Sequence, residues 1–489
     1  MPYPTNSQEW IKALGARLDI QARRAQLYET YYSGIQLAGV TLMSTVKYQE
    51  YFSKMFKAIA DNWLPIVVDA VSERLSIQGF RMGPTETSAD KEAWKFWQYN
   101  CMDARSQALF NTVLTTGCSF IMVWNSGDRD KPVLLTAEHP YEVYVAIDYE
   151  TGLRTAAIKR WHDEWTGEIR VNLYFPDHLE KWIRPKGNNE YLPLGDQAYI
   201  PNPLGTVPIV PIRNRTSLKR DDYLSEFHDV MSTQDQINKL VMDMLIASEY
   251  SAFRQRWVTG IDVPIGEDGK PVELFKLGVD RMLTTGDPAA RFGEFGASDL
   301  SNYVRAIENR VQSLASRTRT PAHYLLGQSG TFPSGETLNA TETGLIAKTK
   351  GHQVEYDDPL EEVVRLGFRV LGDTAKSKIT DSEVMWNDPE YRTESQHVDA
   401  SVKKLAAGIP YEQIWIDLNY TETQRMRFKA WLTEQAQLDA IRVTPVVNSG
   451  AAGNNGAPNE PQPTATLDQQ GMVGSTPVGV RVTSPHVSA

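Results

Sequence analysis

Hydrophobic residues recur every three or four positions through the first part of the chain, which is the period of an amphipathic helix. This period predicts helices over residues 7–32, 62–75 and 89–116. Pro65 falls in the first turn of the second helix, where its missing N–H costs nothing, and Gly117 is expected to end the third. The chain is therefore expected to begin with a group of helices.

From residue 118 to about residue 213 the hydrophobic period shortens towards two, which is typical of strands. Short apolar or alternating runs are separated by turn residues, and the first of them, 118–124, has the continuous apolar character of a buried strand. The run 203–215 holds three prolines, which suits an edge or irregular segment. Residues 1–220 are therefore expected to form an α+β domain.

Two long helical segments flank a compact insert in the middle of the chain. Residues 224–256 contain no glycine or proline, and their broad apolar face includes Leu240 and Met244, so a single helix about 50 Å long is predicted. Residues 257–297 hold glycines, prolines and short β-like runs. The second helix, 298–320, carries an apolar stripe whose steps alternate between four and three, which is the spacing of a helix that packs on another helix. This stripe consists of Leu300, Val304, Ile307, Val311 and Leu314.

The last part of the chain alternates loop and helix. A glycine-rich loop, 321–335, precedes a helical stretch over 336–371 that Pro359 is expected to kink or restart. Residues 394–435 have the pattern of a small helical module. Residues 441–489 carry only four charged side chains and no aromatic ring, which predicts a disordered tail.

Composition narrows the class of protein. The 489 residues include 50 Lys+Arg and 61 Asp+Glu, a net charge of −11, which argues against a protein that holds nucleic acid tightly. It does not exclude a protein that nucleic acid slides past. The two cysteines, Cys101 and Cys118, form no metal or disulfide pattern, and no signal peptide or membrane-spanning run is apparent, so a soluble protein made in a cytoplasm is expected.

Residues 330–337, GTFPSGET, have the glycine spacing of a phosphate-binding loop. However, Glu336 occupies the position of the lysine, and Pro333 removes one of the N–H groups that cradle the phosphates. The loop also follows a predicted helix, whereas a phosphate-binding loop follows a strand. The eight histidines show no HxH or HExxH spacing, and no GxSxG is present. The sequence therefore predicts neither an enzyme nor a metal or cofactor site.

Several short stretches, taken in order, are more informative than any one motif. They are 31–34 (YYSG), 62–80 (NWLPIVVDAVSERLSIQGF), 115–124 (TTGCSFIMVW), 138–148 (EHPYEVYVAID), 205–215 (GTVPIVPIRNR), 225–243 (SEFHDVMSTQDQINKLVMD), 320–327 (TPAHYLLG), 334–348 (SGETLNATETGLIAK) and 386–410 (WNDPEYRTESQHVDASVKKLAAGIP). Together they resemble the portal proteins of tailed bacteriophages, in the branch named after SPP1 gp6. The resemblance covers about residues 20–435.

The resemblance implies a predominantly helical α+β fold in a ring-forming, portal-type architecture of wing, stem, clip and crown. By this resemblance the parts are a wing (1–220), a first stem helix (221–256), a clip (257–297), a second stem helix (298–320), a tunnel loop (321–335), a kinked wing helix with a return strand (336–390), a crown (391–440) and a disordered tail (441–489).

The resemblance also implies a function. Portal proteins form rings, usually of twelve subunits, at one vertex of the capsid, and they conduct double-stranded DNA during packaging and ejection. The implied partners are other copies of the chain, the major capsid protein, the scaffolding protein, the large terminase, a head-completion adaptor and, without sequence preference, double-stranded DNA, but no membrane. The implied location is the virion, after synthesis in the bacterial cytoplasm, and no cofactor or catalytic residue is implied.

Three groups of residues are implied to act in such a ring. The tunnel loop that lines the channel would be Gln328, Ser329, Gly330, Thr331, Phe332, Pro333, Ser334 and Gly335. The candidate contacts to the DNA backbone are Arg317, Arg319, Lys348 and Lys350. The candidate subunit interface of the stem is Leu240, Met244, Leu300, Val304, Ile307, Val311 and Leu314.

Two alternatives to a portal protein stay open at this point. Another head–tail connector or adaptor ring would also self-assemble, although the length and the paired long helices argue against a small adaptor. A degenerate nucleotide-binding enzyme would have to use residues 330–337, against the physical objections above.

Overall fold

The computed structural model describes residues 4–35, 61–84, 86, 88–195, 198–217, 223–252, 256–260, 288–294, 296, 299–326, 335–390, 394–418, 420 and 422–443. The chain divides into two units, Met1–Phe428 and Lys429–Ala489. Every site described below lies in the first unit.

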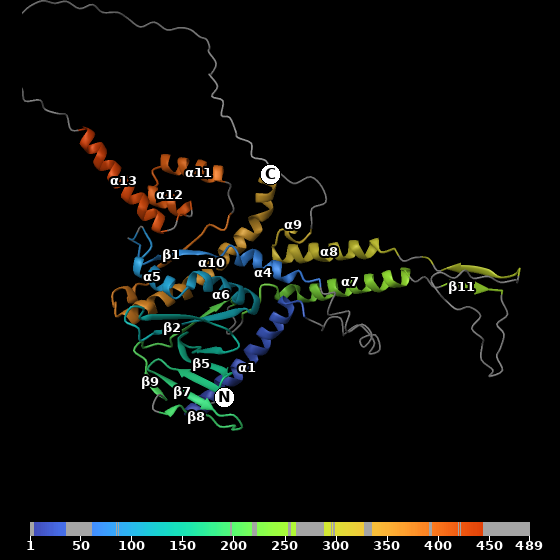
Figure 1. Cartoon of the computed structure of the whole chain (residues 1–489), viewed down its shortest axis with the longest axis horizontal. Coiled ribbons are helices and arrows are strands. Elements are labelled where there is room, and N and C mark those ends of the chain that lie inside the picture. The colour runs from blue at the N-terminus through green and yellow to red at the C-terminus, as the bar shows by residue number, and fades with distance from the viewer. Residues whose placement is uncertain are drawn as a thin grey trace, which may run out of the picture. The chain divides into compact units, whose positions relative to one another are not determined.

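Helices and strands are both numerous, as an α+β chain requires (Figure 1). The helices are α1 (Ser7–Tyr32), α4 (Leu64–Ser72), α5 (Lys91–Tyr99), α6 (Met102–Thr116), η2 (His228–Val230), α7 (Met231–Ala252), α8 (Ser301–Thr318), α9 (Ala322–Leu325), α10 (Gly335–Leu371), η3 (Lys376–Lys378), α11 (Glu394–Ala406), α12 (Tyr411–Asp417) and α13 (Glu422–Val443). The strands are β1 (Ile77–Arg81), β2 (Cys118–Asn125), β3 (Val133–Glu138), β4 (Val143–Ile147), β5 (Arg154–Asp163), β6 (Glu168–Tyr174), β7 (His178–Arg184), β8 (Leu192–Pro193), β9 (Tyr199–Pro201), β10 (Ile209–Arg213), β11 (Arg256–Thr259), β12 (Arg291–Glu294) and β13 (Glu383–Trp386).

The largest sheet is an antiparallel meander in the order β4-β5-β6-β7-β8, with β9 also paired to β7. Its apolar face packs against α1, where Leu14 and Leu18 meet Ile158 and Leu173 in one buried cluster. The alternating runs predicted between 118 and 213 are therefore confirmed as strands, and the first helix covers part of their sheet.

A second sheet of three strands, in the order β10-β2-β3, lies against the main hydrophobic core. Strand β10 is at its edge and places Pro211 opposite Phe120 of β2. An edge strand leaves one row of backbone groups unpaired by the sheet, so a proline is tolerated there. The proline-rich run was predicted to be an edge or irregular segment, and the pairing confirms it.

The single helix predicted over 89–116 is wrong at its middle. Helix α5 ends at Tyr99, and Cys101 adopts a left-handed backbone with φ 56° before α6 begins. The Asn100 amide donates to Val133 O (3.0 Å), and its Oδ1 accepts from Leu135 N (3.1 Å). These bonds to β3 compensate the break, and helical periodicity carries no information about such a distant partner.

The helix predicted over 224–256 starts later than expected. Residues 223–227 are not helical, η2 follows, and α7 begins only at Met231 and has 22 residues, so it is about 33 Å long. Leu224 N donates to Asn214 O (3.1 Å) and Glu226 N donates to Leu114 O (2.8 Å). The backbone before η2 is therefore bonded to β10 and α6 instead of to a preceding helical turn.

Helices α7 and α8 run side by side, and the two-stranded pair β11-β12 lies beyond their far ends (Figure 1). The stripe on α8 is only partly covered within the subunit. Val311 and Leu314 are buried and Ile307 is half-buried against the same core, but Val304 is 45% exposed. The predicted helix–helix packing is thus made at the base of the pair, while the outer part of the stripe stays open.

Helix α10 has 37 residues and continues through Pro359 as one element, so the proline does not restart the helix, and the alternative that it kinks the helix stays a prediction. After it, β13 pairs with β1 and joins 383–386 to 77–81. In the helical module, α11 ends at Ala406, Gly408 follows at φ 89°, and Ile409 N donates to Lys404 O. The predicted tail from 441 begins within α13, and residues 444–489 lie outside the described residues.

Candidate functional site

The predicted tunnel-loop residues 328–334 lie outside the described residues, and Gly335 is the first residue of α10. The chain on either side of this loop is described. Helix α8 precedes it and α10 follows it, while α9 lies inside the predicted range 321–335, which is therefore helical over Ala322–Leu325. The site described below lies at the base of the α7–α8 pair, where α10 passes the end of α8.

Three segments distant in sequence meet there in a buried group of charges. Lys348 of α10 places its Nζ 2.9 Å from Glu226 Oε1 and donates to Thr318 O, at the end of α8, over 2.8 Å. The side chains of Lys348 and Glu226 are each only 8% exposed. One ammonium group thus connects α10 to the segment before η2 and to the carboxyl end of α8.

One turn further along α10, His352 lies between two carboxylates. Its Nε2 is 3.2 Å from Glu226 Oε2, its Nδ1 is 3.7 Å from Glu355 Oε2, and its side chain is 7% exposed. Glu355 Oε1 accepts from the amide (2.7 Å) and the hydroxyl (2.6 Å) of Thr216. The loop after β10 is thereby attached to the same group.

Burial and charge act in opposite directions on these groups. Burial by itself would raise the pKa of Glu226, but Lys348 and His352 outweigh it and hold that pKa well below its usual value. Burial would lower the pKa of His352, but the Glu226 and Glu355 carboxylates outweigh it and raise it. Lys348 and His352 therefore stabilise the charged form of Glu226, and Glu226 and Glu355 stabilise the charged form of His352, whereas the two cations repel each other.

Arg317 and Arg319 lie beside this group at the end of α8. Arg317 donates to Asp229 O (2.6 Å) and to Thr233 Oγ1 (3.2 Å), which are uncharged acceptors. Arg319 is exposed and takes a left-handed backbone with φ 55°. In the described part of the chain neither guanidinium forms an ion pair with a carboxylate. The nearby Asp229 carboxylate is instead paired with Arg215 over 2.6 Å.

All these side chains border one cavity of about 470 Å³. Its lining residues are Arg215, Glu226, Asp229, Val230, Arg317, Thr318, Arg319, Ala347, Lys348, Gly351, His352 and Glu355. Four of these are Arg or Lys and three are Asp or Glu, so with His352 charged the cations are in excess. The arrangement is suited to meeting an anion at the outer guanidinium groups, while the inner charges are already paired.

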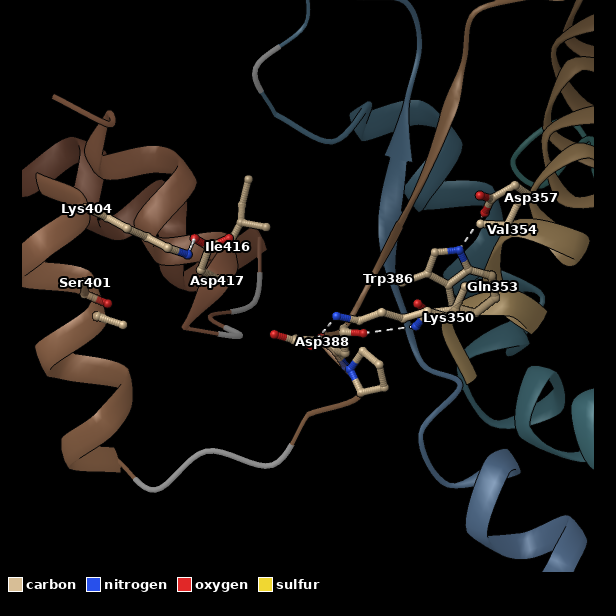
Figure 2. Close-up of a pocket in the computed structure, with 13 residues that line it drawn as sticks. Lys350, Gln353, Val354, Asp357, Trp386, Asp388, Ser401, Lys404, Ile416 and Asp417 are labelled. Atoms are coloured by element: carbon tan, nitrogen blue, oxygen red, sulfur yellow. Dashed lines mark hydrogen bonds and ion pairs between the residues drawn. The ribbon is translucent and has the colours of Figure 1, made fainter. Parts of the chain in front are cut away.

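Lys350 does not belong to this cavity. Two positions along a helix differ by about 200°, so Lys348 and Lys350 face opposite sides of α10. Lys350 borders a second cavity, also of about 470 Å³, between α10 and β13 on one side and α11 and α12 on the other (Figure 2). There Lys350 Nζ lies 3.9 Å from Asp388, and Lys404 pairs with Asp417. The four candidate DNA contacts are therefore not one cluster.

The remaining predicted interface residues lie on the α7–α8 pair. Leu240 and Met244 of α7 are half-buried, and so is Leu300, which caps the start of α8. Among the described helices none is both long and apolar enough to cross a membrane. The described residues also contain no group of three or more His, Cys, Asp or Glu side chains placed to hold a metal ion.

The sequence analysis missed Glu226, His352, Glu355 and Arg215 as members of one site. A signal was present in α10, because Lys348, His352 and Glu355 are spaced by four and three and so share a helix face. No comparable signal exists for Glu226 and Arg215, which reach the site only through the turn before η2 and the loop after β10.

Comparison with known proteins finds a matching family and similar proteins. The model of the family "Phage portal protein, SPP1 Gp6-like" matches residues 12–439. The portal protein of Mycobacterium phage L5 is 28% identical over 426 residues, which cover 84% of this chain and 85% of that protein. The portal protein of Mycobacterium phage D29 is 29% identical over 388 residues, covering 76% and 79% of the two chains.

Two of the solved structures with a similar chain are of gene transfer agent particles. One is a chain of the virion of a native gene transfer agent particle, with 12% identity and a TM-score of 0.35, covering 71% of this chain and 84% of that one. Another is from the neck of a native gene transfer agent particle, with 11% identity and a TM-score of 0.38, covering 72% and 87%. Because the family model spans most of the sequence, the chain belongs to the SPP1 Gp6-like family of phage portal proteins, which are structural components of the virion.

Proposed function

We propose that this chain forms a ring, of twelve copies as is usual in its family, at one vertex of a phage capsid. The ring conducts double-stranded DNA during packaging and ejection. The observation that carries the proposal is the family match over residues 12–439, which includes every described helix and strand except the two ends of the chain. The fold supports it, because the outer part of the α8 stripe is left open in a single copy.

Within such a ring the parts take the roles that the sequence analysis expected. Residues 1–220 and 336–390 are the wing, 391–440 the crown, and 257–297 the clip. The pair α7 and α8 corresponds to the stem, whose exposed Val304 and half-buried Leu240 and Met244 face neighbouring copies. In a closed ring every interface is the same head-to-tail contact, so the stripe of each subunit meets a different surface of its neighbour.

We propose that the partners follow from this position in the virion. The large terminase docks during packaging, and a head-completion adaptor replaces it afterwards. The wing meets the major capsid protein, and the scaffolding protein guides assembly of the ring into the shell. The protein is made in the bacterial cytoplasm and ends in the virion.

We propose that DNA is contacted at its backbone and without sequence preference. Arg317 and Arg319 are the candidate cations, because neither guanidinium has a carboxylate partner among the described residues, and phosphate contacts carry no sequence information. Lys348 is buried in an ion pair, which favours a structural role for it. The acidic balance of the chain, −11 per copy, disfavours tight binding along the rest of the path.

Assembly of the purified full-length chain tests the proposal. Native mass spectrometry should show a closed oligomer of one stoichiometry, and negative-stain images should show rings with a central channel. A chain that stays monomeric at micromolar concentration in every salt condition contradicts the proposal. A small open oligomer without a channel contradicts the conduit, although not the family.

A further inference from the structure

We propose that Glu226, His352 and Glu355 form a proton-operated latch, which tightens the joint between α10 and the segment before η2 when His352 is charged and loosens it when His352 is neutral, while the pair of Lys348 with Glu226 is kept in both states. The latch is a property of one subunit and does not depend on ring formation. Only its functional consequence, given below, rests on the proposed function.

His352 lies where its protonation sets the net charge of the buried side chains around it. Both ring nitrogens face carboxylates, Glu226 at 3.2 Å and Glu355 at 3.7 Å, and neither makes a well-aligned hydrogen bond within the described chain. The contact to Glu226 is therefore an attraction between charges rather than a directional bond. It connects residues 126 positions apart, so it crosses between two separate segments of the fold.

Charge counting shows what the proton does. With His352 protonated, the inner group holds two cations, Lys348 and His352, and two anions, Glu226 and Glu355. Loss of the proton leaves Lys348 as the cation of the inner group against two carboxylates, in a group whose side chains are 7% to 22% exposed, and the further positive charge of the cavity lies on the exposed Arg317 and Arg319. Two buried carboxylates that share one cation are held less firmly, so the contact between the segments weakens.

The other charged groups around His352 do not remove this dependence. They come from every element packed against it: Asp229 of η2, Arg215 after β10, Arg317 and Arg319 of α8, and Tyr356 of α10. Asp229 is paired with Arg215, and Arg317 and Arg319 lie exposed at the end of α8. The pKa of Tyr356 is raised well above its usual value by burial, so its hydroxyl stays neutral. Among these groups His352 is the one that loses its charge as the pH rises through its raised pKa.

The direction of the pH effect follows from the pKa of His352, which the joint raises above its ordinary value of 6.5. Stabilisation from a raised pKa is fully present below pH 6.5 and is lost as the pH rises through the raised value. The lowered pKa values of Glu226 and Glu355 add stabilisation that is present above about pH 4.5 and is lost only in stronger acid. The latch is therefore closed in weak acid and opens on the alkaline side.

The latch would affect function through the segments to which α10 is attached. Gly335, the start of α10, directly follows the predicted tunnel loop, and Lys348 bonds α10 to the end of α8 just before that loop. Closing the latch holds α10 more firmly against the base of the stem, and opening it leaves this helix held there by the contacts of Lys348. In the proposed ring, the proton on His352 would set how firmly the loop is held.

Hydrogen exchange of the full-length chain, followed by mass spectrometry between pH 5.5 and 9.5, tests the latch. After correction for the chemical pH dependence of exchange, protection of peptides covering 342–358 and 223–232 should fall as the pH rises. The expected fall is about tenfold for each pH unit between the pKa of His352 in the open and the closed joint. Peptides from β5 and β6 should keep constant protection.

Two variants test whether the fall in protection depends on His352 and on its carboxylate partner. In His352→Gln, protection of α10 should equal the alkaline level of the unmodified chain at every pH. In Glu355→Gln, neutral His352 no longer leaves an excess charge, so the fall should be smaller and shifted to lower pH. His178→Gln is the matched control, because His178 also lies between two carboxylates, Asp177 and Glu180, but belongs to β7.

The proposal is overturned if the unmodified chain keeps the same α10 protection from pH 5.5 to 9.5. It is also overturned if His178→Gln removes the pH dependence as fully as His352→Gln does. If His352→Gln does not fold, Glu355→Gln decides, because an unshifted transition in that variant is incompatible with the latch.

Discussion

Gly117 closes the turn between α6 and β2 in a backbone conformation that other residues avoid. Its φ is +89°, and its carbonyl accepts from Asn214 N over 2.8 Å. A Cβ placed there would lie 3.0 Å from the Leu224 carbonyl carbon and 3.1 Å from a ring carbon of Tyr223. The sequence identified this glycine as a helix end, but the close approach of the segment before η2 is visible only in the fold.

Replacement of Gly117 by alanine should destabilise the chain for both reasons. We expect a loss of about 2 to 4 kcal/mol, from the left-handed backbone together with the close contact to Leu224. Urea unfolding of the full-length variant measures the change.

The control for this substitution is Gly127→Ala. Gly127 has a similar φ of +79°, but no atom lies within 4 Å of its added Cβ. The expected loss there is only about 1 to 2 kcal/mol. Equal losses at the two positions would show that the contact with Leu224 carries no cost.

Helix α8 serves two surfaces at once. Its inner stripe residues, Val311 and Leu314, are buried in the main core, whereas Val304 nearer the start of the helix is open. The base of the stripe has a partner within one subunit, because α7, η2 and the core cover it. The outer part of the stripe is therefore the part left for a contact between copies.

Val304→Asp should separate assembly from folding. The substituted carboxylate lies on an exposed position of the single subunit, so secondary structure and melting of the monomer should be unchanged. In the proposed ring it would become a buried charge at each interface, and the concentration needed for assembly should rise by about tenfold or more. Analytical ultracentrifugation over a dilution series measures this concentration.

Asn309→Asp is the matched control, because it adds the same charge to an exposed position of α8 outside the stripe. It should assemble like the unmodified chain. If Val304→Asp assembles equally well, the outer stripe is not part of an interface.

The chain as a whole combines an acidic balance with two arginines at the end of α8 that have no carboxylate partner among its described residues. The proposed conduit uses both properties, because repulsion along the path prevents sticking while a few cations hold the backbone weakly. The proposed DNA contacts belong to the scale of the whole ring, because they would arise only when many copies surround one DNA molecule. They involve the predicted loop 328–334 and the pair Arg317 and Arg319.

Deletion of 328–334 should leave ring formation intact but lower the DNA retained per particle, because the proposed loop lines the narrowest part of the channel.

The double change Arg317→Ser with Arg319→Ser should lower retention in a salt-dependent manner, as the loss of phosphate contacts requires. Nuclease protection of packaged DNA measures both effects.

Ring formation by each variant is the control for this experiment. A deletion that unfolds the chain would mean that the loop belongs to the core. Full retention of DNA in both variants would exclude the loop and the arginines as channel contacts.

The helix and strand periods, the turn glycines and the edge prolines are patterns of neighbouring residues. They therefore predict α1, α4, β2, α8 and α11 without knowledge of the fold. The short stretches that resemble the family are also runs of neighbouring residues, and they identified the family correctly. The break at Asn100 and the late start of α7 are different, because bonds to Val133, Leu135 and Asn214 decide them. The charged group is the extreme case. Glu226 lies well over a hundred residues before Lys348 and His352, and only the packing of α10 against the base of α8 brings them together, since burial, not spacing, makes their charges depend on one another.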